Sequence, residues 1–523
     1  MVRKKDATAA AEGATPAAAG APGAVELAVL LAAIILIATL VRSAWVCDDA
    51  FITLRTVDNF VNGHGLTWNV AERVQTYTHP LWMMLLTAVY FFTREAYFSG
   101  LALSLVLSSV VIWLTVTRVA RSSLGALLGL AVLILSKSFV DFSTSGLENP
   151  LTHLLLALFV AACFPARGPR RPVVLALIAG LGVLNRMDTL LLYLPALAWA
   201  LRETPRKQAL KTLALGFSPF LAWELFALFY YGFLFPNPAY AKLATGIPRL
   251  ERLEQGFHYF LNSLSVDPLT LVAVAGATLL ALRDRHAGEI ALGAGIGLYL
   301  AYTLWIGGDF MGGRFFSAPL FVSALILSRW DAGSPGVASL LPFLLVGVLG
   351  LSTPFSPVFS DFHYARHRAE AADNARITDE RAFYYEGSGL LRAGREFEMP
   401  THKSAIEGRQ ARQQGPAVVV RGGVGMFGYY AGPAVHIIEP WAVCAPLLAR
   451  LPVAEGAFWR IGHFPRELPA GYEETQRTGS RRITDPQVAR LYDALEIVTR
   501  DPLFSGRRLV EIWKLNTGAY ALR

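Results

Sequence analysis

Two adjacent carboxylates, Asp48 and Asp49, stand just past the end of a long apolar run that begins at Val25. Such a pair can hold a divalent cation or accept a proton, or it can be structural and cap a helix that starts near Phe51. Adjacent side chains on a helix diverge by roughly 100°. One aspartate can therefore act while the other is structural, and the sequence leaves both interpretations open.

The segment around this pair, residues 46–79, is dense in aromatic, acidic and basic side chains and is longer than a connection requires. It adds Glu72 and His79 to the candidate residues. Further polar residues interrupt or flank apolar runs, namely Glu148, Arg186, Asp188, Asn237, Lys242, Asp309 and Arg314. Ionisable groups at membrane depth are costly, which makes them functional candidates. Arg186 and Asp188 can instead be a structural ion pair, and Asp309 and Arg314 can be loop charges.

The composition indicates a membrane setting for these groups. Of the 523 residues, 54% are hydrophobic and only 16% are charged, whereas soluble domains carry about 25% charged residues. This excludes an ordinary cytosolic protein, and the three cysteines exclude a disulfide scaffold. We attribute the net charge of +8 to basic cytoplasmic loops and expect no nucleic-acid partner.

Apolar runs recur along the first 352 residues and predict a polytopic α-helical membrane protein. They cover about 25–45, 80–93, 97–117, 124–140, 150–164, 172–202, 210–231, 267–282, 289–306, 316–329 and 337–352. The run at 172–202 is interrupted by Asn185–Asp188, which predicts two short helices there and about twelve apolar segments in total.

Charge predicts how these segments are oriented. Basic clusters place three loops in the cytoplasm, at 167–171, 202–211 and 283–285. The polar segments 46–79, 232–266 and 307–315, together with everything after about residue 353, then lie on the outer side. A cytoplasmic N-terminus and an external C-terminus require an odd number of spans. The run at 80–93 is short for a hydrocarbon core of ~30 Å, so we expect it not to cross, which leaves about eleven spans.

This pattern divides the chain into three parts. We expect a disordered cytoplasmic tail at 1–23, a transmembrane domain at 24–352 with an extracytoplasmic catalytic loop at 46–79, and an extracytoplasmic soluble domain of mixed α/β structure at 353–523. A strand-like segment at 417–421 leads into Gly422–Gly428, which contains G-x-G-x-x-G. The external location and the lack of a clear βαβ pattern favour a tight turn over a dinucleotide site.

Together the candidates suggest one external-facing cavity lined by carboxylates, cations and aromatic side chains. Cations suit a phosphate and carboxylates suit a hydroxyl-bearing acceptor. A sugar linked to a lipid phosphate presents both, so we hypothesise sugar transfer from a polyprenyl phosphate. The main alternative is a polytopic transporter of a lipid-linked or anionic substrate, which predicts inverted repeats that are not visible in the sequence. No G-x-S-x-G or zinc-type histidine spacing supports a hydrolase.

An ordered set of motifs from residue 48 to about 472 resembles the GT-C superfamily of membrane glycosyltransferases. Within it, the likeness is to the arabinofuranosyltransferase branch of mycobacterial cell-wall synthesis and its bacterial homologues. The motifs are DDAFITLR at 48–55, GHGLTWNVAERVQTYTHPLW at 63–82, TSGLENPL at 144–151, NRMD at 185–188, PN at 236–237, GGDFMGGRFFSAP at 307–319, PLLARLP at 446–452 and WRIGHFPRELPAGY at 459–472.

The resemblance implies a GT-C architecture in the bacterial inner (cytoplasmic) membrane, with the active site facing the periplasm or the cell exterior. It implies a polyprenyl-phosphate-linked D-arabinofuranose donor, and a surface glycan or glycoprotein acceptor. It also implies that Asp48 and Asp49 are essential, and a β-product from a β-linked donor would mean net retention, by a carboxylate nucleophile or a front-face mechanism.

We expect Asp48 to be the catalytic base or nucleophile and Asp49 to position the acceptor or a metal. The remaining expected roles are donor-phosphate binding by Arg186, Lys242 and Arg314, and sugar or acceptor binding by Glu72, His79, Glu148, Asp188, Asn237, Asp309 and His463. A divalent cation (Mg²⁺, Mn²⁺ or Ca²⁺) on Asp48 and Asp49 is a further expectation, because many GT-C enzymes use one. The sequence departs from the family pattern at Gln75, at His79 and at 439–446, where Glu439 replaces an aspartate and a second acid is missing.

Overall fold

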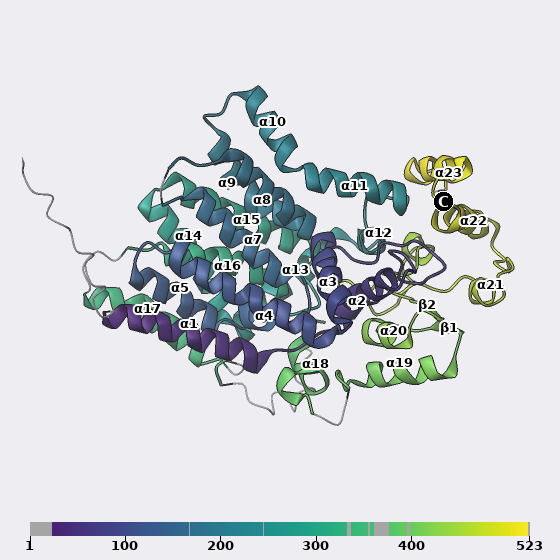
Figure 1. The fold of residues 1–523 in the computed structure, drawn as a ribbon, viewed down its shortest axis with the longest axis horizontal. Coiled ribbons are helices and arrows are strands. Elements are labelled where there is room, and N and C mark those ends of the chain that lie inside the picture. The colour runs from purple at the N-terminus through teal and green to yellow at the C-terminus, as the bar shows by residue number, and fades with distance from the viewer. Residues whose placement is uncertain are drawn as a thin grey trace, which may run out of the picture.

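The computed structural model describes residues 23–166, 168–243, 245–331, 336–353, 356–359, 376–394 and 398–520. The expected tail at 1–23 therefore lies outside the described residues except for Gly23. Figure 1 shows a helical bundle on one side and the C-terminal elements on the other, with α2 and α3 between them.

The bundle is built from the apolar runs of the sequence. Its helices are α1 (Ala24–Ser43), α3 (Pro80–Thr93), α4 (Tyr97–Leu114), α5 (Ser123–Leu135), α7 (Asn149–Cys163), α8 (Pro172–Asn185), α9 (Leu190–Leu201), α10 (Arg206–Gly216), α11 (Ser218–Tyr230), α14 (Pro268–Asp284), α15 (Ala287–Ile306), α16 (Arg314–Ser328) and α17 (Val337–Leu351). Proline stands in the first turn of α3, α7, α8, α11 and α14, where its missing N–H costs no hydrogen bond. The predicted break at 185–188 is confirmed.

Two segments differ from the expected pattern. The run at 124–140 ends at Ser136, where the chain turns into the short helix α6 (Lys137–Phe142) and the Ser136 hydroxyl accepts a hydrogen bond from the Phe139 N–H. The segment 232–266, expected as a loop, holds the helices α12 (Asn237–Leu243) and α13 (Arg249–Val266). Its polar, amphipathic sequence hid the helical period of α13 from a search for apolar runs.

The apolar helices fit a transmembrane protein. Among the described residues, α1, α15 and the helix Tyr97–Val119 are long and apolar enough to cross a membrane, and the number rises to five if each bent helix pair is one span. These pairs are α10 with α11, bent by 56°, and α13 with α14, bent by 102°. Seven further apolar helices are shorter.

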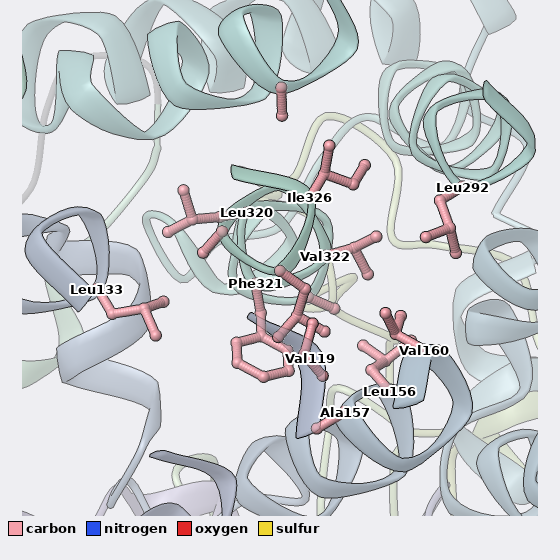
Figure 2. Close-up of a cluster of buried hydrophobic side chains, with 14 of the residues drawn as sticks. Val119, Leu133, Leu156, Ala157, Val160, Leu292, Leu320, Phe321, Val322 and Ile326 are labelled. Atoms are coloured by element: carbon pink, nitrogen blue, oxygen red, sulfur yellow. The ribbon is translucent and has the colours of Figure 1, made fainter. Parts of the chain in front are cut away.

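Helix α16 runs through the centre of the bundle. Figure 2 shows Leu320, Phe321, Val322 and Ile326 of α16 among Leu156 and Val160 of α7, Leu133 of α5 and Leu292 of α15. Twelve of its fifteen residues are buried. Because interiors are packed to crystal-like density, α16 has little freedom to shift. The first residue of this helix, Arg314, is therefore held at a fixed place at one end of the bundle.

The C-terminal elements form a mixed α/β arrangement. They are α18 (Glu380–Ser388), α19 (Lys403–Gln414), β1 (Ala417–Val420), α20 (Gly425–Ala431), β2 (Val435–Ile438), α21 (Tyr472–Thr478), α22 (Pro486–Arg500) and α23 (Gly506–Asn516). Strands β1 and β2 pair in parallel, with Ala417 opposite Val435. The expectation of no βαβ unit was wrong, because β1, α20 and β2 form one.

The C-terminal elements share a core with the polar segment 46–79. The indole of Trp68 is fully buried among Phe427, Val435, Ile437 and Cys444. The segment carries α2 (Asp48–Val61), whose Arg55 is 2% exposed and donates to the backbone oxygens of Trp68, Gly428 and Val435, each at 2.7 Å. A buried guanidinium with three carbonyl partners fixes α2 against the C-terminal elements.

Candidate active site

Glu148 lies at the centre of the charged cluster at this end of the bundle. It stands at the N-cap position of α7, and its carboxylate accepts hydrogen bonds from Arg186 Nη1 at 2.7 Å and Arg314 Nη2 at 3.2 Å. Burial raises the pKa of this carboxyl, but Arg314, His79 and Arg186 together hold the pKa well below its usual range. The side chain is only 1% exposed, so Glu148 acts as a buried anion that holds two guanidinium groups.

Arg186 and Asp188 form the ion pair that the sequence left open. The Arg186 Nε lies 2.8 Å from Asp188 Oδ1, and Nη2 lies 2.8 Å from Oδ2, which makes the pair bidentate. The ring of Phe315 lies beneath the guanidinium at 4.5 Å, and the Tyr299 hydroxyl donates to Asp188 at 3.3 Å. These partners orient Arg186 before any ligand arrives.

The pair Asp309–Arg314 is looser. Arg314 Nη1 lies 3.5 Å from Asp309 Oδ2, while the other Asp309 oxygen accepts from the Phe310 N–H of its own loop at 2.8 Å. The Arg314 Nε is buried without a hydrogen-bond acceptor. Arg314 therefore keeps donor capacity that Glu148 and Asp309 leave unused.

A cavity of about 290 Å³ brings together five of the residues expected to bind substrate. Arg186, Asp188, Lys242, Asp309 and Arg314 all line it. Apolar side chains complete the wall, including Phe235, Leu243, Ile306, Phe315 and Ile461. All three cations expected to bind a phosphate thus line one hollow, and apolar surface lies beside them.

Lys242 differs from the two arginines in this cavity. It is exposed, and in the described ranges it forms no salt bridge. The Gly462 backbone passes close to its ammonium group, where a Cβ would lie 3.4 Å from Nζ. Lys242 is therefore free to pair with an anion that enters the cavity.

Asp48 is bound to the C-terminal elements rather than to the cavity. Its two carboxylate oxygens accept from the Gly425 N–H at 2.9 Å and the Met426 N–H at 2.8 Å, at the first turn of α20. A side chain at Gly425 would collide with the Asp48 backbone, which explains this glycine of the G-x-G-x-x-G pattern. The pattern serves an internal carboxylate, and these two N–H groups are not available to a dinucleotide.

Asp49 faces the cations instead. Burial raises the pKa of this carboxyl, while the charges of Lys242 and Arg314 oppose the shift. Across the residues that the structure covers, the Asp49 carboxylate has no hydrogen bond or salt bridge. Asp48 is thus held by two backbone donors, whereas both oxygens of Asp49 are unpaired within the described residues.

Glu380, at the first position of α18, is a site residue that the sequence analysis missed. It is 7% exposed, and burial raises the pKa of its carboxyl well above the usual value. Asp49 and Asp309 raise that pKa further, whereas Arg460 lowers it. No motif marked Glu380, and its relation to Asp49 is seen only in the effect of the Asp49 charge on its pKa.

Two expected ligand-binding residues serve the framework of the site. His79 Nε2 is bonded to the Thr53 hydroxyl at 2.8 Å and Nδ1 lies 3.3 Å from Glu148, while burial lowers the pKa of His79 to about 4. Asn237 donates to the backbone oxygens of Ala442 and Val443 at 2.9 and 3.0 Å. Asn237 thus fixes α12 and with it Lys242.

The last two expected residues lie on either side of the C-terminal elements. Glu72 accepts from Asn69 at 3.2 Å, away from the cavity-lining residues. His463 packs edge-on against Phe310 and Trp441, with ring centroids 4.3 and 4.4 Å away. It follows Ile461 and Gly462, which line the cavity, so His463 is next to the site and Glu72 is not.

The departure from the family pattern at Glu439 has a structural explanation. The Glu439 carboxylate accepts from the backbone N–H groups of Trp441 at 2.6 Å, Val443 at 2.6 Å and Cys444 at 3.2 Å. Burial nevertheless raises the pKa of this carboxyl to about 7. Glu439 shapes the turn that carries the acceptors for Asn237.

The side chains do not fit a divalent cation held by the protein. Both oxygens of Asp48 already accept backbone hydrogen bonds, and among the described residues no three His, Cys, Asp or Glu side chains gather closely enough to hold a metal ion. Hard cations such as Ca²⁺ require several oxygen ligands. We derive no step through a metal.

No protein-family model matches the chain. A terminal beta-(1->2)-arabinofuranosyltransferase of Mycobacterium tuberculosis is 30% identical over 413 residues, which cover 66% of this chain and 63% of that protein. A protein of the same name from Corynebacterium glutamicum is 27% identical over 342 residues, 54% of this chain and 48% of that protein. The chain therefore spans between about half and two thirds of the curated relatives it matches. Both are glycosyltransferases by name, and they support the arabinofuranosyltransferase-like family indicated by the motifs.

Proposed function

We propose that the protein is a membrane glycosyltransferase that moves D-arabinofuranose from a polyprenyl phosphate to a surface glycan or glycoprotein outside the cell membrane. The observation that carries the proposal is the cavity that Arg186, Lys242 and Arg314 line, two of whose charges also act on the Asp49 carboxylate. Guanidinium and ammonium groups are the side chains that bind phosphate. The names of the relatives support the arabinofuranosyl group.

In this proposal the cations hold the donor phosphate before and during transfer. Bond cleavage at the anomeric carbon leaves negative charge on the phosphate oxygen, and fixed positive groups stabilise that charge. Arg186 and Arg314 are already oriented by Glu148, so little reorganisation is required. Lys242 adds the mobile third charge.

Asp49 is the proposed reactive carboxylate. It stands close enough to Lys242 and Arg314 for their charges to shift its pKa. It can accept the proton of the acceptor hydroxyl, or attack the anomeric carbon in a retaining double displacement. Asp309 adds negative charge near it, which favours the positive character that a furanosyl group gains during transfer.

The direct test is transfer from synthetic polyprenyl-phospho-arabinofuranose to an arabinoside acceptor by the purified full chain. A second donor with the same lipid phosphate and a hexose separates the sugar from the carrier. Arabinosylated product from the first donor alone supports the whole proposal. Product from the hexose donor alone keeps the lipid-linked transferase and overturns the arabinose assignment. Binding of either donor without product, across several acceptors, overturns the transferase.

The transporter alternative is not favoured, since both relatives carry transferase names. Reconstituted vesicles check it directly, because a transporter moves labelled substrate across the bilayer without an acceptor. We expect label in the acceptor and none in the vesicle lumen.

A further inference from the structure

A second cavity, of about 680 Å³, lies where α4, α7 and α16 end. It is lined by residues 118–121, by Cys163–Ala166 and Gly168–Arg170, and by Arg329. Four of the lining residues are arginines: Arg118, Arg121, Arg170 and Arg329. Nothing in the proposed transfer reaction uses this cavity.

The two cavities lie at opposite ends of the same helices. Helix α7 follows Glu148 and ends at Cys163, and α16 begins at Arg314 and ends just before Arg329. Fifteen residues at 1.5 Å per residue span about 22 Å. The second cavity is therefore separated from the first by roughly the depth of a thin hydrocarbon core.

Two of the arginines are held in place around the hollow. Arg170 donates through Nε to the Cys163 oxygen at 3.1 Å and stacks 3.9 Å from the ring centroid of Trp199. Arg329 stacks 3.7 Å from Phe164 and donates through Nε to Glu289 at 2.8 Å. The general excess of basic residues in cytoplasmic loops explains why several arginines occur here. It does not explain why two of them are stacked against aromatic rings at one cavity.

Among the described residues, one carboxylate forms salt bridges with the arginines of this cavity. Glu289, 2% exposed, is the carboxylate that pairs with Arg329, and it lies 4.0 Å from Arg121. Within the described residues, Arg118 and Arg170 form no salt bridge. Four guanidinium groups thus face a hollow with one buried carboxylate between them.

We propose that this basic cavity binds an anionic phosphate group, carried by a phospholipid headgroup or free in solution. Basic pockets between membrane helices bind anionic headgroups in this way. The stacked guanidinium groups of Arg170 and Arg329 leave N–H groups for phosphate oxygens, and a cavity at the end of the helices lies at headgroup depth. The site is independent of the proposed transfer reaction.

The test compares two triple variants of the full chain with the wild type, in nanodiscs of equal parts phosphatidylglycerol and phosphatidylcholine. Lipid retained after release is measured by native mass spectrometry. The cavity variant carries Arg118→Gln, Arg121→Gln and Arg170→Gln. The matched control removes three exposed charges from α10, which follows the end of α9 near the same bundle end, by Arg206→Gln, Lys207→Gln and Lys211→Gln.

We expect the wild type and the control to retain phosphatidylglycerol equally and the cavity variant to lose about a hundredfold in affinity, since each basic group near anionic lipid contributes roughly a factor of five. Inorganic phosphate titrated calorimetrically into detergent-solubilised protein forms the second arm. Binding in that arm, lost in the cavity variant, assigns the site to free phosphate instead. Equal loss in the control, or no binding in either arm, overturns the proposal. If the triple variant fails to fold, Arg170→Gln alone is expected to lose about fivefold.

Discussion

Removing one charge from each of the two neighbouring aspartates should produce opposite results. Asp48 accepts two backbone N–H groups of α20, whereas Asp49 has no partner among the described residues. Asp49→Asn should therefore leave the thermal midpoint unchanged or slightly raised and lower the turnover number by about 10²–10⁴, the usual contribution of a positioned acid or base. Asp48→Asn should instead act on stability.

The magnitude for Asp48 follows from its two hydrogen bonds. Asparagine keeps one acceptor oxygen but turns an amide donor toward the second N–H, so one charge-assisted bond is lost, worth about 1.5–3 kcal/mol. Burial has the opposite effect. It disfavours the charged carboxylate and raises the pKa of Asp48 to about 6, and the neutral asparagine does not carry the cost of burying a charge. We expect a net loss of about 1 kcal/mol at most.

The two readouts are a thermal unfolding midpoint and the transfer rate, measured on the same preparations. Asp493→Asn is the matched control, because Asp493 lies exposed on α22 and pairs only with Arg481 in the described part of the chain. The control should change neither quantity. If Asp49→Asn keeps its turnover within tenfold of wild type, or if a stable Asp48→Asn variant loses turnover instead, the assignment of roles is refuted.

Three further outcomes are expected. Lys242→Gln should raise the donor KM about tenfold and lower kcat as well, because it removes a charge that binds the donor phosphate and stabilises the charge left on it at bond cleavage; an unchanged kcat would contradict this. Arg55→Lys should lower stability by about 3 kcal/mol, because a lysine cannot bond all three carbonyls that Arg55 reaches. Faster proteolysis of the chain after residue 376 than in the wild type would show this loss of stability. An unchanged rate of cleavage would contradict the prediction. Glu439 has a pKa raised by burial from 4.5 to about 7, so the folded state binds more protons than the unfolded state within that window. The midpoint of the wild type should therefore fall relative to Glu439→Gln as pH rises from 4.5 to 7, and parallel curves would refute this cause.

Parts of the site that depend on residues close together in the chain could be predicted from the sequence. The apolar runs located most bundle helices to within a few residues. The Arg186–Asp188 pair was visible because its members stand two residues apart. Ionisable residues at the ends of apolar runs were candidates in the sequence, and they include the three cations that line one cavity.

The sequence could not assign roles that depend on distant partners. The donors that hold Asp48 are 377 and 378 residues away, so nothing near Asp48 and Asp49 distinguished one from the other. Glu380 was missed for the same reason, since an isolated glutamate in a polar segment has no pattern of its own. In the sequence, a glycine that makes room for a neighbouring backbone cannot be distinguished from one that binds a dinucleotide. The structure distinguishes them because it shows the neighbour.

Asp48 and the groups that hold it are synthesised far apart in time. The two arginines of the donor cavity, Arg186 after α8 and Arg314 at the start of α16, have both been synthesised by residue 328. The N–H groups that hold Asp48 arrive about a hundred residues later in synthesis, with Gly425 and Met426. Until then the first turn of α2, and the Asp49 it presents, lacks its support. A nascent chain therefore carries the cations of the cavity before α2 has the support of the C-terminal elements.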